Sequence, residues 1–428
     1  MTRRQFSFLI LGGLLLAQGF TLFTRGGYFR LYWIPTSLLI GLLTAACLLA
    51  WNHRWLKPCF NLKTDLPLLG FLGWAALSLL TSVNREETLF EVIRLATLAM
   101  VYFMVTYALP EEPEKKVLAF ALFGLGLAET VYGLLVFISE KPLLHLSWLE
   151  LPPPSAYVSG TFLNHNHFAG LMSMAICLGF GLITSVGRRG QARSEQIAER
   201  VVLAIPCAAM LLGLILSLSR GGWVSFLLAI PFFLALFWWN AHPLWSRVIA
   251  VAMVMVLVVL VFILRVNREP LLQRLATLDT LYYQPEEMTL GNRLTLWKSS
   301  LAMIRDHPWS GTGWGTYRSV YPAYRLGNTL QGVDFAHNGY LQIAAGMGLP
   351  GLGFFLLFLV MLFWEGFRVI ASQGKDFWAL AMPGILAGLF AILVHEVVDF
   401  NLMLPSNLIF FFSLAGIVVG RAQELPSR

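Results

Sequence analysis

The chain has 428 residues, of which 57% are hydrophobic and 12% are charged, and its mean hydropathy is +0.69. Soluble domains carry about twice that charged fraction, so the composition excludes an ordinary soluble protein. Apolar runs of roughly 18 residues recur without a period of two, which predicts an all-α polytopic membrane protein and excludes a membrane β-barrel. The formal net charge of +7 is typical of basic cytoplasmic loops, and we expect no nucleic-acid partner.

The apolar runs predict about twelve transmembrane helices by the length criterion. We interpret the first run as an uncleaved helix, because many more runs follow it. Loops rich in Lys and Arg alternate with loops that contain few of them, so we expect both termini to be cytoplasmic. The cysteines show no metal-ligand spacing, which predicts free thiols. The predicted spans are residues 6–23, 33–51, 66–82, 89–109, 117–138, 162–185, 201–219, 222–239, 248–265, 343–365, 377–398 and 406–420.

These spans divide the chain into three parts. Residues 1–265 hold transmembrane helices 1–9, residues 266–342 form a large loop on the outer side, and residues 343–428 hold helices 10–12. A second long outer loop, residues 139–161, contains three consecutive prolines and predicts a stiff connector. Long translocated loops escape the positive-inside rule. The basic residues of the large loop therefore indicate either anion binding or folding on the membrane face.

The large loop contains a predicted amphipathic helix. Asn292 is a candidate N-cap, and His307-Pro308 would end the helix. Apolar residues at helical spacing between them form one face, which suits either the membrane interface or a dock against the bundle. The members of this face are Leu294, Trp297, Leu301 and Ile304.

A turn and three tyrosines follow this helix. The sequence SGTGWG predicts a turn over residues 310–315. Tyr317, Tyr321 and Tyr324 suit either stacking on a sugar or anchoring at the membrane interface, and we favour the interface.

Two arginines are candidate anion ligands. Arg220 lies in a tight outer turn with small neighbours such as Ser219 and Gly221, which suits the interior of a bundle. Ionisable residues at such positions are commonly functional, although an interfacial Arg that snorkels to water is the alternative. Arg293 begins the amphipathic helix, where free N–H groups favour an anion, and its alternative is an ordinary surface Arg. Two fixed guanidinium groups can bind a pyrophosphate bidentately.

His337 is a candidate general base. An imidazole accepts a proton from an attacking hydroxyl near neutral pH, although a lone His is more often structural. The neighbouring Asn338 and Asp334 favour a polar pocket around it. The glycines from Gly346 to Gly353 indicate close helix packing or a bend at the start of the tenth span.

Two further polar groups lie at outer helix ends. Asn164 and His167 belong to the run Asn-His-Asn-His that opens the sixth span. Histidines two residues apart do not share a helix face, so we expect no metal site here. Asn164 and His167 either contact a sugar or belong to a polar helix cap. Near the end of the eleventh span, a second group either orients the site or pairs internally, and it consists of His395, Glu396 and Asp399.

Several well-known catalytic motifs are missing from the sequence. It has no Walker loop, no HExxH and no Gly-x-Ser-x-Gly, and the large outer loop has no Asp-x-Asp cluster. Nucleotide-driven transport and metal-assisted sugar-nucleotide chemistry therefore lack support, and we expect no cofactor.

Four segments of the sequence resemble the O-antigen ligase and polymerase superfamily of bacterial envelope enzymes. The twelve-span layout with one large outer loop is similar as well, so the resemblance covers most of the chain. The motifs are fairly specific for the superfamily when they occur in this order, and they do not choose a member. The matching segments are GTFLNHNHFAG (160–170), SLSRGGW (217–223), GNRLTLWKSSLAMIRDHPWSGTGWG (291–315) and HNGYLQIAAGMGLPGLG (337–353).

The resemblance implies a fold related to C-type glycosyltransferases and an inverting, metal-independent glycosyl transfer. The active site would lie on the periplasmic face of the bacterial inner membrane, among membrane lipids. The donor would be a glycan on undecaprenyl pyrophosphate, with Arg220 and Arg293 binding the pyrophosphate. His337 would act as base toward the acceptor hydroxyl or position it. The acceptor is a sugar of lipid A–core in ligases and another lipid-linked repeat in polymerases.

We therefore expect a glycosyltransferase of the O-antigen ligase type. A polymerase of O-antigen or exopolysaccharide repeat units is the second interpretation, and protein O-glycosylation by a related ligase is the third. A transporter or flippase of lipid-linked glycans is the alternative from another class. Transporters usually place paired charges at the midplane of the membrane, whereas the charges here gather on one face. A structural scaffold does not explain the Arg-rich outer loop.

Overall fold

The computed structural model describes most of the chain as a bundle of helices. Among the described residues no strand is present, and ten helices are long and apolar enough to cross a membrane. The all-α polytopic prediction is therefore confirmed. The predicted ninth span, residues 248–265, lies outside the described residues, as do most of the proline-containing connector and residues 266–289 of the large loop. The described residues are 2–53, 56, 60–139, 157–187, 192–238, 290–326, 332–372 and 376–425.

The helices follow the predicted spans, with shifts of a few residues at most of their ends, and the helix Arg193–Leu216 starts well before its predicted span, 201–219. In the first half of the chain they are α1 (Arg3–Phe23), α2 (Arg30–Asn52), α3 (Leu62–Leu77), α4 (Arg85–Phe103), continued by the π-helix η3 (Met104–Ala108), and α5 (Glu112–Ser139). In the second half they are α6 (His165–Ser185), α7 (Arg193–Leu216), α8 (Arg220–Phe237), α11 (Leu290–Asp306), α12 (Tyr317–Tyr324), α13 (Gly339–Ala371), α14 (Phe377–His395) and α15 (Pro405–Gln423). Short 3-10 helices are η1 (Arg25–Gly27), η2 (Ser78–Leu80) and η4 (Asn401–Met403).

Burial separates central helices from peripheral ones. In the most apolar stretch of each helix, 94% of residues are buried in α15, 78% in α6 and 72% in α14, against 22% in α7 and 28% in α2. The polar turn between α14 and α15 therefore joins two of the central helices of the bundle. Any charged side chain in that turn is enclosed by other helices.

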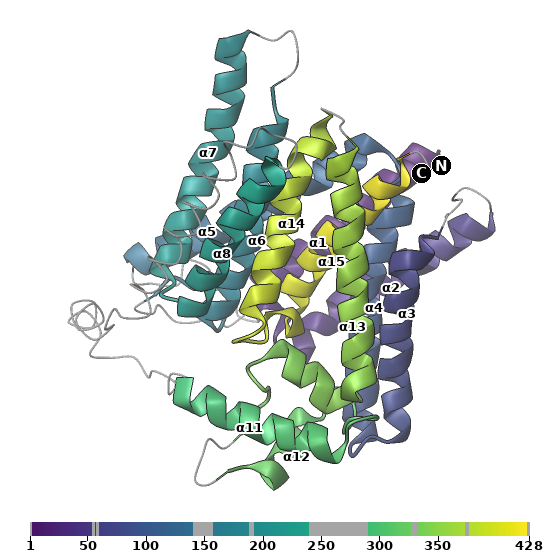
Figure 1. The fold of residues 1–428 in the computed structure, drawn as a ribbon. Coiled ribbons are helices and arrows are strands. Elements are labelled where there is room, and N and C mark those ends of the chain that lie inside the picture. Colours follow the sequence, from purple (N-terminus) through teal and green to yellow (C-terminus); the bar gives the residue numbers. More distant parts are fainter. Residues whose placement is uncertain are drawn as a thin grey trace.

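The two ends of the bundle differ. Both termini lie at one end, and α11 and α12 lie across the other end (Figure 1). Ion pairs join the elements at the end with the termini, where Lys115 contacts Glu424 and Arg421 contacts Asp376. The chain ends and the polar loop are therefore on opposite sides of the apolar helices, as the alternation of basic loops predicts.

The long helix α13 bends near its start. Gly348 has φ 68° and ψ −178°, and Pro350 follows it inside the helix. The bend frees two backbone carbonyl groups, which accept hydrogen bonds from the turn after α11. Thr312 N donates to Ala345 O at 2.9 Å, and Gly313 N donates to Gly346 O at 2.9 Å. The predicted bend and the predicted turn over residues 310–315 are therefore hydrogen-bonded to each other.

The amphipathic helix of the large loop is present as α11, with two differences from the prediction. It begins at Leu290, so Asn292 lies inside the first turn and the N-cap assignment is wrong. The face packed against the protein carries Leu296 and Met303, which are 1% and 0% exposed. Leu294 and Leu301 from the predicted apolar face are 47% and 55% exposed. The docking face was missed because serines share it, which hides its apolar character in the sequence.

The tyrosines after this turn have a different role from the one predicted. Tyr317 and Tyr321 are 2% and 1% exposed, and their rings stack 5.8 Å apart between α12 and α11. The Tyr317 hydroxyl also hydrogen-bonds Ser300 Oγ at 2.9 Å. Interfacial anchoring is therefore wrong for these two residues, which join α12 to α11 instead.

The cysteine prediction holds wherever the structure tests it. Cys47, Cys177 and Cys207 are free thiols. Cys59 lies outside the described residues.

Candidate functional site

The candidate site is centred on Asp399, in the turn between α14 and α15. Asp399 is fully buried, and its Oδ1 accepts a hydrogen bond from the backbone N of Phe400 at 2.9 Å. Three side chains from other elements surround the carboxylate. Arg293 Nη2 lies 3.5 Å from Oδ2, and both His167 Nε2 and His337 Nδ1 lie 3.7 Å from Oδ1. We call Asp399, Arg293, His167 and His337 the Asp399 cluster.

The charge of Asp399 is stabilised by its neighbours. Burial by itself would raise the pKa of this carboxyl. The contacts with His167 and His337 oppose burial and hold the pKa of Asp399 well below its usual range. The Asp399 carboxylate is therefore ionised near neutral pH.

Polar atoms of the cluster keep hydrogen-bonding capacity. Among the described residues, Arg293 Nε, His167 Nε2 and His337 Nδ1 are buried and have no hydrogen-bond partner. Buried polar groups are usually paired, so a group of unpaired atoms around one carboxylate needs an explanation. Bound water or a polar ligand would satisfy them.

His337 is held in a strained backbone conformation. Its φ is +48°, a region that residues other than Gly rarely adopt. Trp297 Nε1 donates a hydrogen bond to the carbonyl oxygen of His337 at 3.2 Å. The imidazole makes an edge contact with the ring of Phe400, with centroids 4.8 Å apart. Strain of this kind persists only where the surroundings enforce it, and it is commonest at functional sites.

The next residues fix the start of α13 to the turn that carries Asp399. Asn338 caps α13 by accepting from Leu341 N at 3.0 Å, and its Nδ2 donates to Val397 O at 2.8 Å. Gly339 N donates to Glu396 O at 2.8 Å. Asn338 is therefore a structural connector between His337 and the Asp399 turn, with its amide already hydrogen-bonded.

Arg220 lies in a neighbouring turn. Helix α7 ends at Leu216 and α8 begins at Arg220, with Ser219 as N-cap donating to Asn166 Oδ1 at 2.6 Å. Arg220 is half-buried and forms no hydrogen bond or ion pair with any described residue. The tight turn predicted around Arg220 is confirmed.

The turn of Arg220 adjoins the Asp399 cluster through His395. A methyl group at Gly221 would lie 2.7 Å from His395 Nε2, so the turn and this imidazole are in direct contact. His395 is 1% exposed and ends α14, four residues before Asp399. The sequence left two interpretations of His395, Glu396 and Asp399: they orient the site, or they pair with one another. The described ion pairs favour orientation of the site, because Asp399 contacts Arg293 and the histidines His167 and His337.

Two predicted site residues have partners elsewhere. Asn164 is the N-cap of α6 and accepts from Asn166 N at 2.8 Å, as the helix-cap alternative requires. Asp334 accepts from the Tyr28 hydroxyl at 3.1 Å and lies 3.2 Å from Arg318 Nη1. Burial and this carboxylate raise the pKa of Tyr28 to about 12. Asp334 therefore ties the loop to the α1–α2 connection, and no described contact joins it to the Asp399 cluster.

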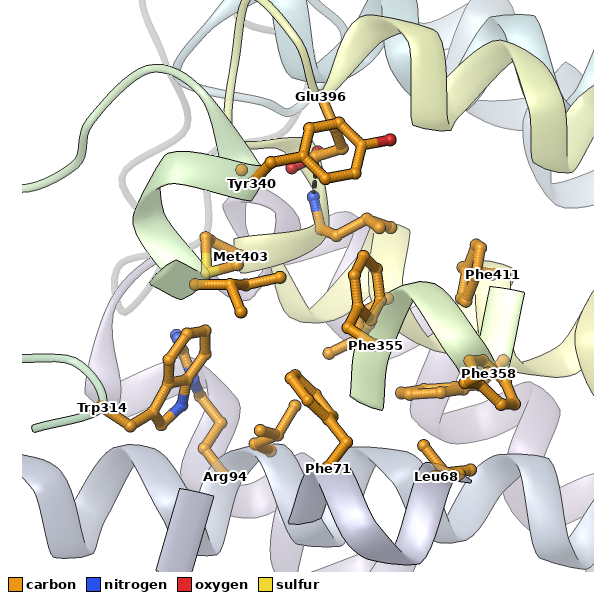
Figure 2. Close-up of a pocket in the computed structure, with 16 residues that line it drawn as sticks. Leu68, Phe71, Arg94, Trp314, Tyr340, Phe355, Phe358, Glu396, Met403 and Phe411 are labelled. Carbon is orange, nitrogen blue, oxygen red and sulfur yellow. Dashed lines mark hydrogen bonds between the residues drawn. The ribbon is translucent and has the colours of Figure 1, made fainter. Parts of the chain in front are cut away.

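An apolar pocket lies beside the start of α13, between α3, α4, α13 and α15. Gly339 and Tyr340 line it only two and three residues after His337, and Arg94 and Trp314 lie together on one wall (Figure 2). The cavity volume is about 30 Å³, so the space is narrow. Sequence reasoning missed this pocket, because its walls come from four separate helices. Its deeper walls are formed by Leu68, Phe71, Phe355, Phe358, Leu408 and Phe411.

These features define a polytopic helical membrane protein with a buried Arg, His and Asp cluster at the end of the bundle opposite the termini. Residues 205–356 match the family model described as O-Antigen ligase, which confirms the resemblance of this chain to the O-antigen ligase superfamily. The matched segment contains Arg220, Arg293 and His337, whereas His167 and Asp399 lie outside it. No curated protein matches the chain. Among the described residues, no three His, Cys, Asp or Glu side chains are grouped to hold a metal ion.

Proposed function

We propose that this protein transfers a glycan from undecaprenyl pyrophosphate to a sugar hydroxyl of lipid A–core, with inversion and without a metal. The observation that carries the proposal is the Asp399 carboxylate, which holds Arg293 and His337 in one buried cluster beside the free Arg220. The family match supports ligase or polymerase chemistry in general.

Arg220 and Arg293 are the proposed ligands of the donor pyrophosphate. Arg220 has no partner among the described residues, and Arg293 keeps Nε unpaired beside its contact with Asp399. Fixed guanidinium groups stabilise the negative charge that grows on the pyrophosphate as it leaves. Because undecaprenyl pyrophosphate is a good leaving group, this stabilisation and one base are sufficient for transfer.

His337 is the proposed base. Its Nδ1 faces Asp399, so Nε2 is the ring nitrogen left for the acceptor. Nε2 takes the proton of the acceptor hydroxyl while the oxygen attacks the anomeric carbon from the face opposite the pyrophosphate. The bond from that carbon to the phosphate oxygen breaks, and its electrons leave with the lipid pyrophosphate. Asp399 stabilises the imidazolium that forms.

The other predicted site residues have different proposed roles. His167 lies in the Asp399 cluster, which suits contact with the glycan or with its bound water. Asn338 and Asn164 act first as helix caps, so their contribution to glycan binding is through the shape of the site. Asp334, in the large loop beside Tyr28 and Arg318, is the proposed outer contact for an acceptor sugar.

The apolar pocket supports a lipid-linked substrate. Gly339 and Tyr340, two and three residues after the proposed base, line it, and its other walls are largely aromatic and aliphatic (Figure 2). A hydrocarbon chain placed there would be held by removal of apolar surface from its surroundings, while the polar head remained at the cluster. We propose that part of the undecaprenyl chain occupies this space.

The proposed orientation has both termini in the cytoplasm and the Asp399 cluster on the periplasmic face of the bacterial inner membrane. The placement of the termini and of α11 at opposite ends supports it (Figure 1). In the proposed three-part organisation, the large loop supplies Arg293 and His337 to helices of the flanking parts.

A reconstituted assay tests the proposal. Purified protein is given undecaprenyl-pyrophosphate oligosaccharide alone, and then the same donor with lipid A–core. We expect a product only when lipid A–core is present, and activity that survives chelation by EDTA. A ladder from donor alone would instead identify a repeat-unit polymerase. No product from competent donors would contradict transfer to lipid A–core and favour another acceptor, such as a protein, or a flippase. A strict metal requirement would contradict the mechanism.

A further inference from the structure

A short segment before α6, together with the first three residues of α6, connects the two halves of the candidate site. We call residues 157–167 the strap. At its far end, Ser219 Oγ, beside Arg220, donates to Asn166 Oδ1, and His167 Nε2 faces Asp399. His165 Nδ1 lies 2.6 Å from Ser217 O in the turn between α7 and α8. The strap thus contacts both the turn of Arg220 and the carboxylate of the Asp399 cluster.

The strap is fixed in its middle by one buried carboxylate. Oε1 of Glu129, on α5, accepts from Thr161 N at 2.6 Å and from Thr161 Oγ1 at 2.8 Å. Thr161 Oγ1 also lies 2.6 Å from Leu22 O at the end of α1. Glu129 and Thr161 are both 0% exposed. This point therefore joins α5 and α1 to the strap through a few short hydrogen bonds.

The surrounding backbone is built to bring Glu129 this close. Gly160 has φ +59°, and a methyl group there would lie 2.2 Å from Glu129 Oε1. Val158 N donates to Leu216 O at 3.0 Å, which fixes the near end of the strap to α7. Any residue other than Gly at 160 would push the carboxylate away from Thr161. The glycine at 160 therefore leaves the space that the Glu129 carboxylate needs to reach Thr161.

We infer that Glu129 is a positioning residue, which holds the strap through Thr161 so that Asn166 and His167 keep the Arg220 turn and the Asp399 cluster in register. This inference rests on the proposed function, because its consequence is measured as transfer. Removing the carboxylate leaves the buried Thr161 N without its acceptor, and Thr161 Oγ1 keeps only Leu22 O. The strap then loses its connection to α5 and is free to shift. Gln at this position keeps an oxygen acceptor of the same reach.

The test compares Glu129→Ala, Glu129→Gln and Glu114→Ala in full-length protein reconstituted in lipid. Glu114 is a matched control because it is also on α5, is 1% exposed and has no hydrogen-bond partner for either carboxylate oxygen among the described residues. It lies about 22 Å away along the helix. Hydrogen exchange of the strap is measured in parallel with transfer kinetics, so that strap order has a readout independent of activity.

For Glu129→Ala we expect faster exchange of the strap and a fall of tenfold or more in kcat/KM, most of it in kcat. Glu129→Gln should keep both within about threefold of the original protein, because the amide oxygen can still accept from Thr161 N. Strap exchange or kcat/KM in Glu129→Ala equal to that of Glu114→Ala would overturn the inference. So would a Gln variant as impaired as the Ala variant. If the unmodified protein transfers no glycan, the proposed function fails instead.

Discussion

Nδ1 of His337 lies 3.7 Å from Oδ1 of Asp399, and Nε2 of His167 lies at the same distance from the same oxygen. One carboxylate oxygen therefore faces two imidazole rings from two different helix starts. The sequence gives no local sign of this arrangement, because the three residues are far apart in the chain. It makes the charge of Asp399 the first quantity to test.

Replacing Asp399 by Asn should lower kcat by about a hundredfold or more, because the imidazolium that forms at His337 loses its counter-charge. The measurement is transfer from a lipid-linked donor under saturating conditions. Asp306→Asn is the control, since Asp306 contacts Arg305 and no member of the cluster. Equal loss in both variants would show that a nonspecific loss of charge causes the effect.

Arg220→Ala, Arg293→Ala and His337→Ala should each abolish transfer, because each removes either a ligand of the pyrophosphate or the base. Size-exclusion chromatography in detergent should show normal folding and insertion for the Arg220 variant, whose side chain contacts no described partner. Arg293→Ala leaves Asp399 with one contact fewer, so we expect a lower melting temperature for that variant. Full activity in any one variant would remove that residue from the mechanism.

The contribution of Asp399 to stability should depend on pH. Its pKa is well below the usual range in the folded protein, so its stabilisation is complete above the unfolded pKa and is lost as pH falls through the folded pKa. The melting-temperature difference between the original protein and Asp399→Asn should thus be larger at about pH 6 than at about pH 3, since an unperturbed Asp has a pKa of about 3.9. A difference that grows on acidification would contradict the ionised assignment.

Gly339→Ala should disturb the site from the side of α13. A methyl group there would lie 1.8 Å from Glu396 Oε2, so the turn that carries Asp399 must move. We expect lower melting temperature and lower transfer, with a cost of about 1–3 kcal/mol. Gly353→Ala is the matched control on the same helix, because nothing lies within 4 Å of its added methyl group. That variant should be neutral or more stable by up to about 1 kcal/mol.

Filling the apolar pocket should weaken binding of a long-chain donor. Ile343 lines the pocket and is 4% exposed, so Ile343→Phe places a larger ring into the space. We expect KM for the undecaprenyl donor to rise about tenfold, which corresponds to 1.4 kcal/mol of binding. KM for a short-chain donor should stay unchanged. Leu356→Phe, at a position 42% exposed on α13, serves as the control. A parallel rise for both donors would contradict a role in holding the chain.

Much of the fold could be predicted from the sequence. Runs of apolar residues long enough to cross a bilayer leave few alternatives to helices, because backbone groups in lipid must be hydrogen-bonded internally. The bend near Gly348 could be predicted because Pro350 follows Gly348 two residues later. The docking face of α11 could not be predicted, because serines at 299 and 300 pack against the protein while Leu294 and Leu301 remain exposed.

The site was predictable only in part. Arg220, Arg293 and His337 stood out because charged side chains at the outer ends of apolar helices are costly and therefore informative. Asp399 was seen only as one member of a polar group, and Glu129 was not singled out at all. Neither Asp399 nor Glu129 belongs to a local sequence motif that would indicate which residues contact it.

The sequence by itself determined the class of protein, the two different ends of the bundle and the candidate arginines and histidine. Those properties depend on composition and local spacing, which a one-dimensional pattern records. The tertiary structure decided that Asp399 faces Arg293, His167 and His337, and that Glu129 holds the strap. The reason is physical: a buried carboxylate is stabilised by whichever donors the helix packing brings to it, and that packing is set by contacts between residues distant in the chain.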